Sequence, residues 1–543
     1  MSRALREVMA AAAAATLMLV FASTASAASA GDIVLNGTRM LTGEHSTVTT
    51  TKLPNGAKRL KYEIGPFKII PGQNEIGYTP ITAKPKVDGY ITRMRPDLVY
   101  MNGKVPRVDV VHLHHGVWVN LSRPNSTNNL PELFFAAGEE KTIFQLPKGY
   151  GYRYKASDTW LFNHMLHNLT PVPTQVKMVY EIDFIPDSSP AAKKMKPARP
   201  IWMDVESGKI YPVFNVMKNS GKNNLFTYPD DDPNAYPAGN QRNAWTVDRD
   251  GVLLATAGHL HPGGLHTDLW LERQGAKVRS AKCGKAKTAR AAKKCRLSTP
   301  RGRGDKVHLF RSKAKYYEPA GAVSWDVAMS ATRPDWKVEV KQGDVLTTTA
   351  TYGTKRAAWW ESMGIMVAYM ADADVAKGRN PFKKRVDLPG KPTHGHLAEN
   401  RNHGGKKTNL PDARKLKDGT LNPGTVDILG FNYRLGDLRL PGLGGRPPVV
   451  QQGQSLTFIN QDNPQRIYHS LTSCKAPCNK STGVAYPIAD GPVQFESGTL
   501  GTDPEVATAG ANQWSTPKNL KPGTYTYFCR IHPFMRGAFR VKG

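Results

Sequence analysis

The feature that most constrains this chain lies near its end, where a cysteine, a histidine and a methionine follow one another at three-residue intervals. Cys529, His532 and Met535 come directly after residues 523–528, which alternate as a β-strand does and begin at a Lys-Pro-Gly turn. Soft thiolate and thioether donors combined with imidazole favour copper. One cysteine, two histidines and a weak axial methionine form the blue-copper electron-transfer site. The loop therefore predicts a site for one-electron transfer that needs a second imidazole from elsewhere.

We expect this second imidazole to come from His469, sixty residues upstream, after the apolar segment 455–460. Together His469, Cys529, His532 and Met535 resemble the ligands of the cupredoxins. The close spacing of the last three on one loop is most similar to that of the amicyanins. The resemblance implies a Greek-key β-sandwich with one type 1 copper, over residues 420–543.

The five cysteines fit an oxidising compartment. Cys283 with Cys295, and Cys474 with Cys478, are close enough in sequence to form two local disulfides. This pairing leaves Cys529 as the odd thiol, which supports a metal-binding role for it.

Residues 1–30 have the features of a secretory signal peptide. Arg3 and Arg6 precede an apolar run over residues 8–21, and small Ala-Ser-Ala cleavage sites follow. The run is too short for a stable membrane span, and no later stretch approaches the required length. We expect a secreted or extracytoplasmic protein, in the cell envelope or periplasm, that does not span the membrane.

The net charge of +30 raises the question of an anionic partner. Much of this charge lies in residues 277–306, where lysine and arginine alternate with small residues and no aromatic side chain is available for base stacking. The composition favours a solvated basic loop that contacts an anionic cell surface over specific binding of nucleic acid.

The rest of the chain is predicted to be all-β. A length of 543 residues indicates about three domains. Short alternating segments broken by Gly, Pro and Asn predict two consecutive jelly-roll-like β-sandwiches, over residues 31–190 and 191–373. Residues 374–419 are polar and rich in Gly, Pro and Lys, which indicates a linker before the last domain.

Histidines gather in two places in these sandwiches. The first group contains His112, His114 and His115, followed about fifty residues later by His164 and His167. Residues two apart on a strand share a face, so His112 and His114 are the natural pair. The adjacent His114 and His115 can share a metal only at a β-bulge or a strand end.

The second group contains His259 and His261, whose spacing on a strand also allows one shared metal. About a hundred residues later, Met363 and Met366 offer a thioether suited to cuprous copper.

In this order the two groups resemble the type II copper monooxygenases, the ascorbate-dependent family that includes the peptidylglycine hydroxylating enzyme and dopamine β-monooxygenase. The resemblance covers roughly residues 100–372 and implies two type II coppers. The implied ligands are His114, His115 and His167 at the first copper, with His112 and His164 as alternates, and the catalytic His259, His261 and Met363 at the second, with Met366 as an alternate.

This resemblance implies an oxygen-dependent C–H hydroxylase whose own blue-copper domain supplies single electrons, taken from an external donor. Peptide-amidating members carry an arginine where this chain has Ala257, and their polar residues after the methionine are replaced here by Ile365 and Val367. We therefore expect a small, apolar organic substrate in place of a peptide.

Two other functions stay open on the sequence alone. One is a copper-binding protein for electron transfer, storage or delivery that has no oxygen chemistry. The other is a structural cell-surface protein in which only the last domain binds copper. In the predicted linker, His394 and His396 have chelate-like spacing and His403 lies nearby, so the segment is either an extra metal site or a polar loop with incidental histidines.

Overall fold

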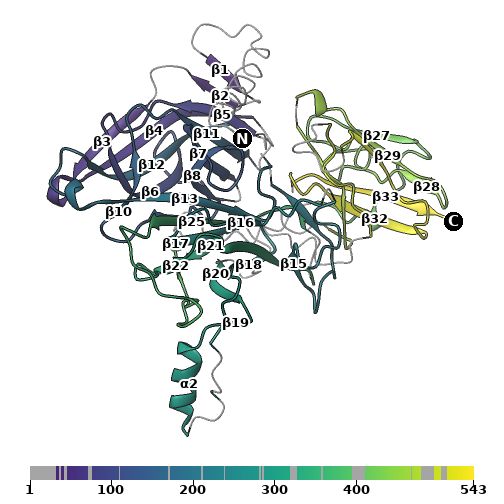
Figure 1. The fold of residues 1–543 in the computed structure, drawn as a ribbon. Coiled ribbons are helices and arrows are strands. Elements are labelled where there is room, and N and C mark those ends of the chain that lie inside the picture. Colours follow the sequence, from purple (N-terminus) through teal and green to yellow (C-terminus); the bar gives the residue numbers. More distant parts are fainter. Residues whose placement is uncertain are drawn as a thin grey trace.

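The computed structural model shows an all-β protein, as predicted, with three lobes of strands in Figure 1. Among the described residues, no helix has the length and apolar character that a membrane crossing requires. The predicted signal peptide, His394, His396 and His403 lie outside these residues. The structure describes residues 32–35, 38–41, 46–70, 76–108, 110–168, 172–209, 212–237, 239–279, 283, 287–317, 327–355, 359–393, 410–465, 467–478, 494–502, 510–532 and 534–543.

The first sandwich packs a four-stranded antiparallel sheet against strands of a larger sheet. Aromatic side chains fill the space between them, and Trp118 contacts Phe135, Phe162 and Tyr180 there. The four-stranded sheet has the order β5 (Ile76–Ile81), β11 (Trp160–Asn168), β7 (Val111–Pro124) and β8 (Pro131–Gly138). The opposing strands are β1 (Asp32–Leu35), β2 (Thr38–Leu41), β3 (Thr47–Lys52), β4 (Lys58–Ile69), β6 (Gly89–Tyr100), β9 (Phe144–Gln145), β10 (Tyr150–Tyr154) and β12 (Thr174–Pro186).

The second sandwich is joined to the first through β13, which pairs in parallel with β10 and antiparallel with β25. One of its sheets contains β13 (Lys196–Asp204), β17 (Gly251–Leu260), β21 (Val327–Ala331), β22 (Val338–Val340), β25 (Gly364–Asp372) and β26 (Lys391–Pro392). The other contains β15 (Leu225–Tyr228), β16 (Ala244–Thr246), β18 (Gly264–Glu272), β19 (Gly302–Arg303), β20 (Lys306–Tyr316) and β23 (Val345–Gly353), while β14 (Phe214–Val216) pairs with β24 (Trp359–Ser362).

The third domain has two small sheets around an aromatic core that includes Phe458, Tyr527 and Phe539. It occupies the right-hand lobe of Figure 1. The first sheet contains β27 (Thr425–Ile428), β29 (Thr457–Asn460) and β31 (Gln513–Ser515), and the second contains β28 (Val449–Gln451), β33 (Arg536–Lys542), β32 (Gly523–Phe528) and β30 (Thr472–Cys474).

Residues at both ends of the segment 374–419, where we expect a linker, pack against the neighbouring domains. Phe382 and Val386 lie in the core of the second sandwich. Ala413 is buried against the third domain, where its carbonyl accepts a hydrogen bond from the Arg540 guanidinium at 2.7 Å. The segment is polar in overall composition but includes a few apolar side chains. Burial of these side chains holds one end of the segment against the second sandwich and the other end against the third domain.

Part of the basic segment 277–306 is helical, where we expect a loop. It contains helix α2 (Ala289–Ser298), which projects from the body in Figure 1. The Thr288 hydroxyl accepts a hydrogen bond from the amide of Ala291 at 3.1 Å and so caps the helix, while alanine, lysine and arginine favour its interior. Both predicted disulfides, Cys283–Cys295 and Cys474–Cys478, are confirmed.

Candidate metal centre

The third domain brings His469, Cys529 and His532 together. Cys529 is the first residue after β32, and His532 lies on the loop that leads to β33. The Nδ1 atoms of His469 and His532 are 3.1 Å apart, and the Cys529 Sγ lies 3.7 Å from the His532 Nδ1. All three side chains are fully buried.

These donors fit one small cation. Nitrogen and sulfur ligands held about 2.0–2.3 Å from one ion lie about 3–4 Å from one another. Met535 is fully buried in the same cluster, and its amide donates to the His532 carbonyl at 2.8 Å, which closes the loop. Three of the four residues predicted to hold a type 1 copper, His469, Cys529 and His532, therefore place their donor atoms together, and Met535 lies in the same buried cluster.

Hydrogen bonds favour the thiolate of Cys529. Burial opposes ionisation, but interactions with His469 and with the amides of Ser470 and His532 lower the pKa of the Cys529 thiol below its ordinary value. The Asp462 carboxylate accepts from the His469 Nε2 at 2.9 Å, so the Nδ1 of that ring is directed to the metal site. Burial lowers the pKa of His469, but Asp462 and Cys529 outweigh this effect and raise it.

Asp462 and Phe431 contact the candidate ligands, and sequence reasoning missed both. Asp462 also accepts from the amides of Gly430, at 2.9 Å, and Phe431, at 3.3 Å. The Phe431 ring then packs edge-on against His469 and His532, with ring centroids 5.7 and 5.1 Å away. No spacing in the sequence links these residues to the metal loop, because they come from separate turns.

The first histidine group lies on β7 and β11. The register between these strands shifts opposite His114, which makes His114 the extra residue of a β-bulge. Ring centroids lie 4.9 Å apart for His112 and His167, 6.0 Å for His114 and His167, and 6.2 Å for His112 and His114. The structure therefore brings His112, His114 and His167 together.

His115 and His164 each contact a polar side chain outside the group. The His115 Nε2 is 3.1 Å from the Asn163 Oδ1, and the ring lines a cavity that His259 also lines. The His164 Nε2 is 3.1 Å from the Thr79 hydroxyl, inside the first sandwich. His164 is thus a core histidine, whereas His115 adjoins both the cavity and His114, whose ring centroid is 5.8 Å away.

Hydrogen bonds to the Nδ1 atoms orient both rings of the second histidine group. The His259 Nδ1 bonds to the Glu140 Oε2 at 3.0 Å, and its Nε2 has no hydrogen-bond partner among the described residues. The His261 Nδ1 donates to the Glu361 carbonyl at 2.5 Å. A carboxylate or carbonyl on one ring nitrogen leaves the other available to a metal.

The two candidate methionines are separated by the fold. Met363 is buried and lines the same cavity as His259, whereas Met366 lies in the core of the second sandwich. Met363 is therefore placed near the second group, and Met366 is not.

The two histidine groups adjoin one another. The ring centroids of His114 and His261 are 4.6 Å apart, and those of His259 and His261 are 5.2 Å apart. Two acidic residues that sequence reasoning missed complete this cluster: Glu139 and Glu140 each place a carboxylate oxygen within 4.8 Å of a ring nitrogen of His259. The only sequence signal for them is a pair of adjacent acids directly after an apolar strand.

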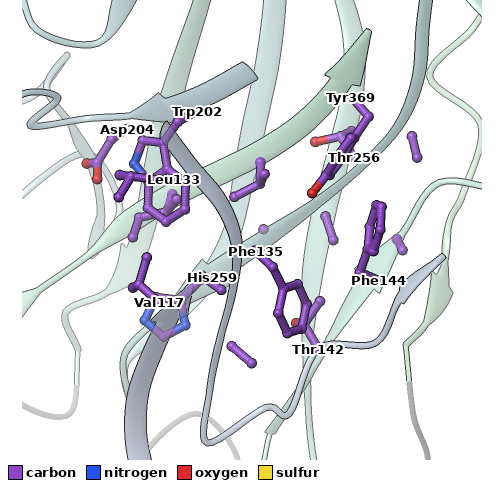
Figure 2. Close-up of a pocket in the computed structure, with 18 of the residues that line it drawn as sticks. Val117, Leu133, Phe135, Thr142, Phe144, Trp202, Asp204, Thr256, His259 and Tyr369 are labelled. Atoms are coloured by element: carbon purple, nitrogen blue, oxygen red, sulfur yellow. The ribbon is translucent and has the colours of Figure 1, made fainter. Parts of the chain in front are cut away.

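An apolar cavity of about 380 Å³ opens beside His259 and Met363. Figure 2 shows Trp202, Phe135 and other apolar side chains around it, together with the Asp204 carboxyl group. Burial raises the pKa of Asp204 to about 7. The cavity can hold a small, mostly apolar molecule next to the second histidine group.

The third domain contacts the first histidine group directly and Glu361, a neighbour of the second group. The His167 Nε2 is 2.9 Å from the carbonyl oxygen of Ile531, the residue before His532. The Thr499 hydroxyl donates to the Glu361 carboxyl group at 2.5 Å, and the carbonyl of Glu361 orients His261. Burial raises the pKa of Glu361 to about 7.

No protein-family model and no curated protein matches the chain. Among solved structures, it is similar to amicyanin: two Cu(I) mutant forms each share 20% identity over 25% of this chain and 94% of theirs, with a TM-score of 0.14. A copper-containing nitrite reductase from Thermus scotoductus SA-01 shares 13% identity over 54% of this chain and 55% of its own, with a TM-score of 0.15. At these scores neither likeness bears on the function of this chain.

Proposed function

We propose that this chain is an extracytoplasmic copper oxidoreductase in which the third domain passes single electrons to the histidine cluster of the two sandwiches. The observation that carries the proposal is the contact between the His167 Nε2 and the carbonyl of Ile531. Because His532 is the next residue, one peptide unit and one hydrogen bond connect a ligand of the candidate type 1 copper to the cluster.

The residues of the third domain fit this role. A type 1 copper supplies reversible one-electron chemistry when it is bound. Cys529 offers a thiolate, His469 and His532 offer imidazoles, and Met535 offers a thioether. Full burial of these ligands excludes water and limits rearrangement between the two oxidation states.

In the sandwiches, His112, His114 and His167 would hold one type II copper, and His259 and His261 with Met363 would hold a second. Dioxygen would be the oxidant, and the adjoining apolar cavity would bind a small organic substrate close to His259. Trp202, Phe135 and their neighbours would exclude water from that substrate. The reaction that we propose is thus the hydroxylation of an apolar C–H bond.

The test compares the copper-loaded full chain with Cys529→Ser, using Asp427→Asn, an exposed change in the same domain, as the control. Oxygen consumption is measured over a panel of small apolar compounds with an external one-electron donor. We expect Cys529→Ser to lose at least about 90% of the donor-driven rate, and the control to keep it. Full activity in Cys529→Ser would contradict the relay. No oxygen consumption by the fully loaded chain on any compound would favour copper storage or delivery.

The projecting basic helix suggests where the protein resides. The positive charge of α2 and its flanks would hold the protein against an anionic surface through long-range attraction. Replacing Arg290, Lys293 and Lys294 by glutamine is expected to reduce binding to vesicles that contain anionic lipid at low salt. Unchanged binding would exclude the helix as the contact.

A further inference from the structure

The Tyr352 side chain reaches two residues that are candidate ligands of the second copper. Tyr352 lies on β23, and its side chain is fully buried. The hydroxyl oxygen accepts hydrogen bonds from the amides of His261 and Met363, each at 3.2 Å, and donates to the carbonyl of Met363 at 2.6 Å. A phenol hydroxyl has one proton and two lone pairs, so these three bonds use its whole capacity. One oxygen atom therefore joins two residues that are far apart in the sequence.

The hydroxyl lies at the end of the pairing between β17 and β25. The last pair of this ladder is Leu260 with Gly364, and one further step along both strands sets His261 opposite Met363. Residues that lie opposite each other across a strand pair extend their side chains from the same face of the sheet. Tyr352 thus joins the two chains at the first position beyond the paired strands, where an imidazole and a thioether leave the same face.

The Tyr352 ring is itself fixed in place. Its strand pairs with β15 and with β18, so the backbone of Tyr352 is held by the sheet. The ring packs edge-on against Phe214, with centroids 5.6 Å apart and an angle of 90° between the ring planes. The hydroxyl is therefore a fixed point that sets the spacing between the backbones of His261 and Met363.

We propose that Tyr352 is a positioning residue of the second metal site, and that its hydroxyl holds His261 and Met363 at the spacing that lets them bind one cuprous ion. This inference rests on the proposed function, because the copper at this site is part of it. Groups that hold metal ligands from behind commonly change metal affinity by about 10- to 100-fold when they are removed. Met363 receives two of the three hydrogen bonds, so the thioether should be the ligand that moves most without them.

The experiment uses the full chain in a Cys529→Ser, Met535→Leu background, which removes both sulfur ligands of the candidate type 1 site. Cu(I) affinity is measured by competition with a chromophoric chelator, and the copper ligands are measured by X-ray absorption. Met363→Leu identifies the equivalent and the copper–sulfur contribution that belong to this site. Tyr352→Phe is compared with Tyr154→Phe, in which another fully buried tyrosine loses a hydroxyl that donates to a backbone carbonyl at 2.7 Å.

We expect Tyr352→Phe to weaken Cu(I) binding at this site by about 10-fold or more and to lose most of the copper–sulfur contribution. Tyr154→Phe should change the affinity by less than about 2-fold and keep that contribution. Parental affinity and copper–sulfur contribution in Tyr352→Phe would overturn this inference alone. A parent without any copper–sulfur contribution that depends on Met363 would overturn the second copper of the proposed function, and this inference with it.

Amide hydrogen exchange in the unmodified chain tests the same geometry without a variant. The amides of His261 and Met363 should be protected from exchange, because the Tyr352 hydroxyl accepts from both. Exchange of these two amides at the rate of exposed ones would overturn the inference, even if Tyr352→Phe does not fold.

Discussion

At the scale of single residues, the candidate ligands are oriented by hydrogen bonds on the far side of each ring. Such outer contacts set which ring nitrogen faces a metal, and they fix the angle of the ring. A ring held in this way needs little rearrangement when it binds an ion. The pairs are His469 with Asp462, His259 with Glu140, His261 with the carbonyl of Glu361, and His112 with the carbonyl of Val108.

Asp462→Asn tests this orientation at the candidate type 1 copper. The variant keeps the shape of the side chain but removes a negative charge next to His469. Removal of this charge would stabilise the reduced, less positive metal centre relative to the oxidised one. We expect the reduction potential to rise by tens of millivolts, as measured by redox titration of the visible absorption. The exposed Asp427→Asn should shift it much less, and equal shifts in both variants would assign the effect to net charge alone.

At the scale of elements, one irregularity in β7 lies within the first histidine group. In a regular strand, His112 and His114 share one face of the sheet and His115 lies on the other. The bulge opposite β11 adds one residue at His114, and the ring centroid of His114 lies 5.8 Å from that of His115 and 6.0 Å from that of His167. His115 then faces the cavity.

A second element-scale feature ties β18 to β20 through a buried charged network. The His308 imidazole bonds to Asp268 at 2.7 Å and to Asp387 at 3.0 Å. Burial lowers the pKa of His308, but these two carboxylates outweigh it and raise the pKa. Burial likewise opposes ionisation of Asp268, yet its partners lower the pKa of that carboxyl group.

His308→Gln should therefore destabilise the protein in a pH-dependent way. The charged imidazole contributes fully to the free energy of unfolding below its unfolded pKa of about 6.5. This contribution is lost as the pH rises through the higher folded pKa. The Asp268 contribution is present above about pH 4 and is lost at lower pH. We expect a loss of about 3 kcal/mol near pH 6 that shrinks at alkaline pH, measured by thermal unfolding.

The matched control is Arg249→Gln, which breaks an exposed pair with Asp248 at 3.4 Å and should cost under about 1 kcal/mol. A loss in His308→Gln that stays constant from pH 5 to 9 would show that the ring acts only through packing.

At the scale of the whole molecule, the third domain packs against the sandwiches close to both histidine groups. Ile531 contacts His167, and Thr499 contacts Glu361. Cys474, Cys478 and Phe528 belong to an apolar cluster that also contains residues of the second sandwich. The domain is therefore docked by apolar burial and positioned by two hydrogen bonds.

Thr499→Val should loosen this docking without changing any proposed ligand. It removes the donor to Glu361, which leaves a buried carboxyl group without that bond and costs about 1–3 kcal/mol of docking free energy. We expect faster hydrogen exchange in residues 494–502 and 359–366, and slower reoxidation of the type 1 copper by the sandwiches. Thr457→Val, which breaks the contact with Ser515 inside the third domain, is the control. Unchanged exchange in Thr499→Val would show that the hydrogen bond does not hold the domains together.

The sequence alone determined those features whose residues are close along the chain. The loop from Cys529 to Met535 carries its ligands at fixed spacing after one strand, so the local backbone brings them together. Short alternating segments predicted the all-β fold, and cysteines 4 and 12 residues apart predicted the disulfides. In each case, the geometry of a short stretch of chain is enough to bring the residues together.

The tertiary structure alone decided which residues from distant segments meet. Strand pairing created the bulge at His114, and sheet packing placed Glu139 and Glu140 against the two histidine groups. Domain docking set Ile531 on His167. These contacts depend on strand register, on packing between sheets and on the fit of one domain against another, and no single stretch of sequence encodes them.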